Sequence, residues 1–214
     1  MNKTVTDNRC AGKFIAFEGI DGSGKSTQIN RLIKKLTEMN VACCGTKEPT
    51  DAPVGALIRQ LLTGRMTADN KVIASLFIAD RTDHLLNETD GIMQKINSGI
   101  TVITDRYYFS SYAYHGVDVD MDWVIDGNKI NSDILRPAVT VFLDVPVKKA
   151  LERIEKNRFH KELFEKEERL TKVREKYFEA FDKLKDTENI AVIDADADEE
   201  TVFERIWEAV SAYI

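Results

Sequence analysis

The residues best suited to chemistry form a glycine-rich stretch, residues 19–26 (GIDGSGKS), which fits the pattern GxxxxGK(S/T). Gly22 and Gly24 lack the Cβ atoms that would keep backbone N–H groups from converging on a phosphate. A helix beginning near Lys25 would add the positive end of its dipole. Lys25 is placed to reach the β- and γ-phosphates, and the Ser26 hydroxyl to ligate Mg²⁺. The predicted nucleotide-binding residues are Gly19, Ile20, Asp21, Gly22, Ser23, Gly24, Lys25, Ser26 and Thr27.

The flanks of this stretch favour the same interpretation. Residues 14–17 are a short apolar run typical of a buried parallel strand. After the stretch, apolar residues recur at helical spacing, at Ile29, Leu32, Ile33 and Leu36. The alternative is an ordinary turn between strand and helix with a solvent-exposed lysine. Because motif and flanks agree independently, a phosphate-binding loop is the favoured interpretation.

Two carboxylates could complete a metal site. Asp105 follows the apolar residues 100–104, and Asp144 follows residues 139–143. Each stands where a strand-end carboxylate commonly holds the water shell of Mg²⁺. Arg106 beside Asp105 favours the Asp105 site, although a salt bridge between these two is the simpler alternative. Since an arginine binds phosphate and does not activate water, the pair indicates phosphoryl transfer over hydrolysis.

The sequence also bears on which base is bound. A guanine-binding NKxD motif has its nearest match at residues 128–131 (NKIN), which lacks the aspartate. Phe77 and Arg81 are four residues apart, so they share one helical face, where a ring can stack on a base and a guanidinium can donate to its edge. Taken alone, such a pair is more simply explained by core packing beside a solvated arginine.

The rest of the sequence predicts the strands and helices that position these residues. Strands are predicted at residues 14–17, 41–46, 100–104, 139–143 and 190–193. Helices are predicted at residues 25–39, 55–62, 71–86, 91–97 and 148–157, with two more in 109–137 and a closing helix through Val202, Ile206, Trp207 and Val210. Residues 158–174 carry mixed charges, which is typical of a solvated helical surface. This alternation predicts an α/β fold: a three-layer, doubly wound, five-stranded parallel sheet with helices on both faces.

Length and charge narrow the class of protein. The 214 residues are most simply one domain, residues 13–214, preceded by a loose tail, residues 1–12. A net charge of -6 argues against a broad nucleic-acid-binding surface. The three cysteines have no CxxC spacing, which favours a reducing cytoplasm. No apolar run reaches the length of a membrane span, so we expect no membrane partner.

Four spaced motifs together resemble the thymidylate kinase family of nucleoside monophosphate kinases. Residues 17–27 (FEGIDGSGKST) are similar to the first loop of the family, including the acidic Asp21. Residues 47–49 (KEP) resemble its REP motif, and residues 77–81 (FIADR) its FxADR helix. Residues 105–114 (DRYYFSSYAY) resemble its DRYxxSSxAY segment. The resemblance covers nearly the whole chain from Phe14 and implies the P-loop nucleoside monophosphate kinase fold.

What the resemblance implies is transfer of the γ-phosphoryl group of ATP to dTMP, giving dTDP and ADP. Phe77 would stack on thymine, Arg81 would bind its edge, and Arg106 would hold the acceptor phosphate. Tyr114 would crowd the sugar 2′ position, and Asp21 would meet the 3′-hydroxyl or the metal shell. Further acceptor-site residues would be Glu48, Pro49, Ser111 and His115.

The resemblance also implies a source of extra positive charge. Residues 20–23 contain no basic side chain, which points to the family members that place arginines in a flexible lid. In this chain the lid would lie at about residues 153–166, with Arg153 and Arg158 as the candidate arginines. An alternative role for Arg153 is stacking on adenine, near the loop at residues 195–197, which begins with Ala195. The chain departs from the family pattern at Lys47, Thr50 and His115, and residues 162–165 (ELFE) lack the arginine of a DRFE motif.

Other interpretations remain open from the sequence. A related kinase could act on another acceptor, such as dUMP or a deoxynucleoside. A nucleotide-binding switch could bind ATP without transferring phosphate, although Arg106 and the pair of Phe77 and Arg81 would then have no reason to accompany the first loop. The resemblance further suggests a homodimer packed through helices, with residues 71–97 as plausible contributors.

Overall fold

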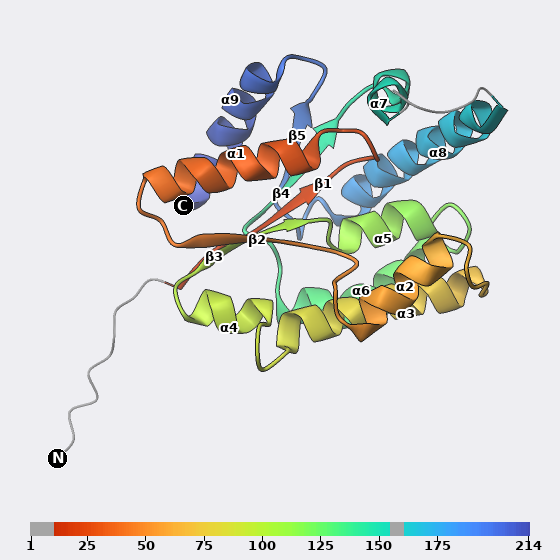
Figure 1. Cartoon of the computed structure of the whole chain (residues 1–214), viewed down its shortest axis with the longest axis horizontal. Coiled ribbons are helices and arrows are strands. Elements are labelled where there is room, and N and C mark those ends of the chain that lie inside the picture. Colours follow the sequence, from red (N-terminus) through yellow and green to blue (C-terminus); the bar gives the residue numbers. More distant parts are fainter. Residues whose placement is uncertain (1–10, 155–160) are drawn as a thin grey trace.

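The structure, a computed structural model, describes residues 11–154 and 161–214, with the side chains of residues 161–166 left out. Within them, five parallel strands form one sheet in the order β2-β3-β1-β4-β5. The strands are β1 (Phe14–Glu18), β2 (Cys43–Lys47), β3 (Thr101–Asp105), β4 (Val139–Asp144) and β5 (Ile190–Asp194). Figure 1 shows α1 and α9 on one side of the sheet and α4, α5 and α6 on the other. The predicted α/β fold with a five-stranded parallel sheet is confirmed.

The helices carry the chain between these strands. Their bounds are α1 (Lys25–Glu38), α2 (Pro53–Leu62), α3 (Asn70–Leu86), α4 (Ile92–Asn97), α5 (Tyr108–His115), α6 (Met121–Ile134), α7 (Val147–Ile154), α8 (Lys161–Leu184) and α9 (Glu199–Val210), followed by a short 3-10 helix (Ser211–Tyr213).

The central strand explains why the site forms where it does. Residues Phe14 to Phe17 of β1 are at most 3% exposed, because the strand has neighbours on both edges and helices on both faces. The register sets Phe17 opposite Asp105 on β3, and Asp105 opposite Lys47 on β2. The carboxyl ends of β1, β2 and β3 therefore meet at one edge, where ligands bind in open α/β sheets.

Two element boundaries differ from the prediction for local reasons. The second strand begins at Cys43 instead of Val41, since the N–H of Val41 still donates to the carbonyl of Leu36 and closes α1. Asn40 takes a positive φ of 60° in this turn. Helix α2 begins two residues earlier than predicted, with Pro53 in its first turn, where the missing proline N–H costs no helical hydrogen bond.

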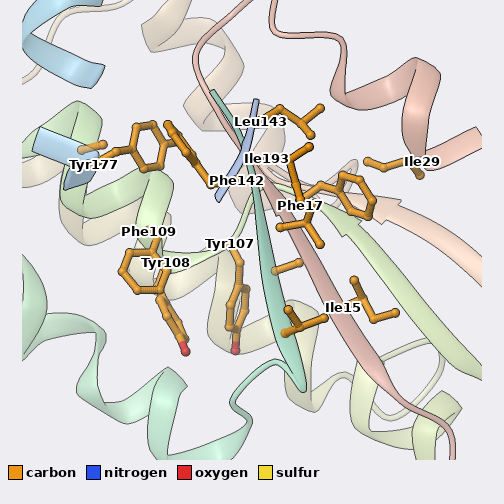
Figure 2. Packing of buried hydrophobic residues seen from close by; sticks show 14 of the residues in the cluster. Ile15, Phe17, Ile29, Tyr107, Tyr108, Phe109, Phe142, Leu143, Tyr177 and Ile193 are labelled. Carbon is orange, nitrogen blue, oxygen red and sulfur yellow. The ribbon is translucent and has the colours of Figure 1, made fainter. Parts of the chain in front are cut away.

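Helix α8 departs in part from the expectation of a solvated surface at residues 158–174: of the side chains described there, those of residues 167–174, Leu170 and Val173 are buried and the others are at least partly exposed. From Leu170 onward it buries one face, with Leu170, Val173, Tyr177, Ala180 and Phe181 at most 8% exposed. These residues pack against α5 and the sheet, and Figure 2 shows Tyr177 reaching toward Phe142 of β4. The charged residues mask this apolar spacing, which continues beyond the stretch that was assessed from sequence.

Parts of the domain prediction fall outside the described residues. Of the predicted tail, residues 1–12, the structure describes only the last two, and the N–H of Gly12 donates to the carbonyl of Ile96. Of the predicted lid, residues 153–166, residues 155–160 including Arg158 lie outside the description, and only the backbone of residues 161–166 is described. The tail and the lid stay predictions.

Candidate active site

The glycine-rich loop joins β1 to α1 with the backbone that the motif requires. Gly24 stands at the N-terminus of α1 with a φ of 95°, in the region that favours glycine. At Gly22, where φ is 79°, an added Cβ would lie 2.3 Å from the carbonyl oxygen of Ala150 on α7. Glycine at residue 22 therefore lets the loop and α7 approach each other closely.

Lys25 is held inside the loop. Its Nζ donates to the carbonyl oxygens of Gly19 at 3.0 Å and Ile20 at 3.1 Å. Burial, with the neighbouring Arg106 charge, lowers the pKa of Lys25 to about 8. A bound phosphate would supply the missing countercharge and favour the charged ammonium.

Asp105 and Ser26 form the site that could hold a divalent cation. The Ser26 hydroxyl donates to Asp105 Oδ2 at 2.9 Å. Asp105 Oδ1 is buried and has no partner among the described residues, which suits a ligand to a hydrated Mg²⁺. The alternative, Asp144, is occupied by a bidentate pair with Arg174 at 2.6 and 2.7 Å. The geometry thus favours Asp105, which the sequence separated from Asp144 only modestly.

Arg106 projects its side chain back over the loop because its backbone takes a φ of 74°, a strained conformation for a non-glycine residue. Its guanidinium donates to Asp21 Oδ1 at 2.6 Å and to Ser110 Oγ at 2.9 Å. It also lies 4.8 Å from the centroid of the Tyr114 ring. Burial alone would lower the pKa of Arg106, but Tyr114, Tyr177 and Asp21 raise the pKa well above its ordinary value, so the group stays cationic.

Two cavities meet at Asp21 and Arg106. The first, about 510 Å³, is lined by residues 21–28 and by Asp105, Arg106, Arg153 and Ala195, among others. The second, about 300 Å³, is lined by Asp21, Arg106 and eleven other residues. Since Asp21 and Arg106 line both, ligands in the two cavities would approach each other at this point.

The second cavity has aromatic walls. Of the predicted acceptor-site residues, those that line it are Pro49, Phe77, Ser111, Tyr114 and His115. The rings of Phe77 and His115 lie 5.0 Å apart between centroids. Burial, assisted by the Arg81 and Arg169 charges, lowers the pKa of His115 to about 4, so its imidazole is neutral near pH 7. The rings of Phe77 and His115 are in direct contact, so a planar ligand would stack on this aromatic wall and would not fit between the two rings.

Arg81 and Glu48 lie behind this cavity. Arg81 is 1% exposed, and its Nε donates to Glu48 Oε2 at 2.8 Å. Its Nη1 donates to Ser111 Oγ at 3.2 Å and to the amide oxygen of Asn128. These donors are engaged by protein groups and the side chain does not line the cavity. The predicted contact between Arg81 and a base edge stays a prediction. Arg81 also supports Ser111, which does line the cavity.

Arg153 and Ala195 meet in the first cavity. The guanidinium of Arg153 donates to the carbonyl oxygens of Gly22 and Ser23 at 3.4 and 3.3 Å, and to that of Ala195 at 3.4 Å. Arg153 thereby spans the glycine-rich loop and the loop after β5. Both roles predicted for it, over the phosphates or against adenine, stay predictions.

Several residues of the site were missed from the sequence. Glu18, the last residue of β1, is fully buried and accepts hydrogen bonds from α5. A carboxylate ending an otherwise apolar strand is the signal that could have marked it. Arg169 of α8 and Asp118 form an ion pair at 2.8 Å on the wall of the second cavity, and nothing local in their sequence predicts that pairing.

Comparison with known proteins identifies the family. The family profile described as thymidylate kinase matches residues 17–206. The chain is 40% identical to a protein of Methanocaldococcus jannaschii named "Probable thymidylate kinase", over 85% of this chain and 86% of that one. The chain belongs to the thymidylate kinase family. A relative of the same name from Thermococcus kodakarensis is 37% identical over 90% and 94% of the two chains. The suspected family is thus confirmed, and this member is a nucleoside monophosphate kinase.

Another relative in the family, "Probable thymidylate kinase 1" of Saccharolobus solfataricus, is 37% identical over 90% of this chain and 94% of that protein. The residues matched by the family profile, 17–206, include every residue that lines the two cavities. Among the described residues of this member, no helix is long and apolar enough to cross a membrane.

Proposed function

We propose that this protein transfers the γ-phosphoryl group of ATP to dTMP, giving dTDP and ADP. The observation that carries the proposal is the pair of cavities that share Asp21 and Arg106. ATP would occupy the cavity of the glycine-rich loop, and dTMP the aromatic cavity. Family membership and the names of the relatives support this choice of acceptor.

The chain's own residues would do the positioning that phosphoryl transfer requires. Backbone N–H groups of residues 22–25 and Lys25 would hold the β- and γ-phosphates, while Arg106 would turn from Asp21 to the acceptor phosphate. Mg²⁺ held by Ser26 and Asp105 would neutralise the charge that develops on the phosphate oxygens. An acceptor phosphate oxygen then forms the new bond to the γ-phosphorus as the bond to the β-phosphate oxygen of ADP breaks. The acceptor is already an anion, so no general base is needed.

Selectivity for the acceptor would come from the walls of the second cavity. Phe77 and the neutral His115 would contact the pyrimidine, and Tyr114, whose hydroxyl lies 3.2 Å from Arg106, would crowd the sugar 2′ position. Ser111, held by Arg81, would present a hydroxyl to the acceptor.

A panel of acceptors tests the proposal. With ATP and Mg²⁺, ADP release should be fastest with dTMP, slower with dUMP and slight with CMP or AMP. Comparable rates with CMP or AMP and none with dTMP would refute it. ATP binding without ADP release for any acceptor would instead favour a nucleotide-binding switch.

We further propose a cytoplasmic homodimer. Among the described residues neither Cys43 nor Cys44 forms a disulfide, which suits a reducing compartment. Helices α2 and α3 expose Leu62, Val72 and Leu86, each at least half exposed, as candidates for burial by a second copy. Light scattering of the purified chain should give about twice the 24.3 kDa mass of one chain.

A further inference from the structure

Glu18 is a fully buried carboxylate that touches neither cavity. It lies at the end of β1, and its Oε1 accepts from the N–H groups of Tyr107 at 2.9 Å and Ser110 at 3.1 Å, at the N-terminus of α5. Its Oε2 accepts from the hydroxyls of Ser110 at 2.5 Å and Tyr177 at 2.9 Å. Four donors thus converge on one carboxylate beside the turn that carries Arg106.

Arg106 sets one hydrogen-bond direction in this cluster. The guanidinium can only donate, so Ser110 Oγ accepts from it at 2.9 Å. The hydroxyls of Ser110 and Tyr177 both lie within donating distance of Glu18 Oε2, and their oxygens lie 2.9 Å apart, where either hydroxyl can donate to the other. Burial raises the pKa of Glu18, and the hydrogen bonds from Ser110, Tyr107 and Tyr177 together with the Arg106 charge offset only part of that rise.

Tyr177 reaches this cluster from far along the chain. It belongs to α8, 159 residues after Glu18 in sequence. Its ring packs 4.8 Å from that of Phe142 and stands edge-on to that of Tyr114, at 6.4 Å and 90° (Figure 2 shows the first two). Tyr114 in turn contacts Arg106 through its hydroxyl and its ring face. Tyr177 therefore contacts both Ser110 and Tyr114, the two side chains of α5 that hold the guanidinium.

Core packing alone does not call for this hydroxyl. Phenylalanine would fill the same space, and a buried hydroxyl costs free energy unless it is hydrogen-bonded. Here the hydroxyl completes the set of donors that pins Ser110 and Glu18 next to Arg106. Without the Tyr177 hydroxyl, one acceptor position on the Glu18 carboxylate becomes vacant. The Ser110 side chain is then free to rotate toward that position and away from the Arg106 guanidinium.

We propose that Tyr177 is a positioning residue for Arg106: its hydroxyl, acting through Glu18 and Ser110, fixes the guanidinium where the two cavities meet. Helix α8 thereby helps to orient the acceptor phosphate without touching it. The expected change in acceptor kinetics rests on the proposed function, whereas the expected placement of the Arg106 side chain does not.

A pair of tyrosine variants separates positioning from stability. Tyr177→Phe removes a hydroxyl bonded to Glu18, and Tyr108→Phe removes one bonded to Glu188 at 2.7 Å. Both rings are fully buried and neither lines a cavity, but the Tyr108 hydroxyl is bonded to Glu188 and not to Ser110 or Glu18. Both variants should lower the melting temperature, since each loses a bond from a tyrosine to a carboxylate, and Tyr177→Phe also loses the contact with Ser110 Oγ.

Only Tyr177→Phe should change acceptor kinetics. We expect the KM for dTMP to rise about tenfold, the loss typical of one hydrogen bond to a charged group, with the KM for ATP unchanged. Equal KM values for dTMP in the two variants would overturn the proposal. If Tyr177→Phe does not fold, Glu18→Gln, which keeps the side-chain shape, should raise the same KM, and an unchanged value would overturn the proposal in its place.

Ligand-free crystal structures of the two variants decide the matter even if dTMP is not the acceptor. In Tyr177→Phe the hydrogen bond from Arg106 to Ser110 should be lost, whereas in Tyr108→Phe it should remain. An unmoved Arg106 in Tyr177→Phe would overturn the positioning role. Absence of dTMP turnover by the unmutated protein would instead refute the proposed function and leave this structural comparison valid.

Discussion

The two cavities are built in different ways. The phosphate cavity is formed mostly by one continuous segment, residues 21–28, whose backbone does much of the binding. The aromatic cavity is assembled from side chains of α3, α5 and α8 and of the loop after β2. Residues that hold its walls in place, such as the pair of Arg81 and Glu48, lie behind those walls and do not line the cavity. A local motif therefore specifies the first cavity, while the second depends on long-range packing.

The largest effect is expected in the phosphate cavity. Lys25→Ala should lower kcat by on the order of 10²–10³, because the ammonium neutralises charge in the transition state. ADP release with saturating dTMP measures the effect. Lys34→Ala on the same helix, whose lysine is largely exposed, is the matched control and should leave kcat unchanged. Turnover that survives Lys25→Ala would contradict phosphoryl transfer at this loop.

The next effect tests the supports of the aromatic cavity. Arg81→Ala removes the arginine that pairs with the buried Glu48 and leaves it only the contact with His84 Nδ1 at 3.2 Å, so the free energy of unfolding should fall by about 3–5 kcal/mol. Urea denaturation measures it. Arg59→Ala on α2, whose arginine side chain is 40% exposed, should cost far less. Equal losses of unfolding free energy in the two variants would show that the buried pair of Arg81 and Glu48 does not support the aromatic cavity.

The metal site allows a comparison between two strand-end carboxylates. Asp105→Asn should raise the Mg²⁺ concentration for half-maximal activity about tenfold, since it weakens the carboxylate expected to hold the metal water shell. Asp144→Asn should not, because Asp144 is already paired with Arg174. Titration of activity against Mg²⁺ measures both, and the reverse ranking would move the metal to Asp144.

The smallest effect is a pH dependence in the aromatic cavity. The pKa of His115 is about 4 in the folded protein, against an ordinary value of 6.5, so the unfolded chain binds the proton more readily between these values. Stability should therefore fall by about 1 kcal/mol per pH unit as pH drops from 6.5 toward 4, and be unaffected by this group above 6.5. His115→Gln should remove that component from unfolding curves measured at several pH values. An unchanged slope in the variant would argue against a buried, neutral imidazole.

The comparison also explains what the sequence could and could not predict. The strands and the loop follow from patterns of four to eight neighbouring residues, so the sheet and Lys25 were predictable. The partners of Arg81 were not, since Glu48 and Asn128 lie 33 and 47 residues away and meet it only after folding. Tyr177 was missed for the same reason, with the added difficulty that charged residues obscure the buried face of α8.

The central claim is that two nucleotides bind at once and meet at Asp21 and Arg106. Calorimetric titration with thymidine and adenosine joined through a chain of five phosphates tests this most directly. Such a compound should bind more tightly than either ATP or dTMP and should be displaced by each of them. If this compound competes with ATP alone and binds no more tightly than ATP, the claim that two nucleotides meet at Asp21 and Arg106 is contradicted.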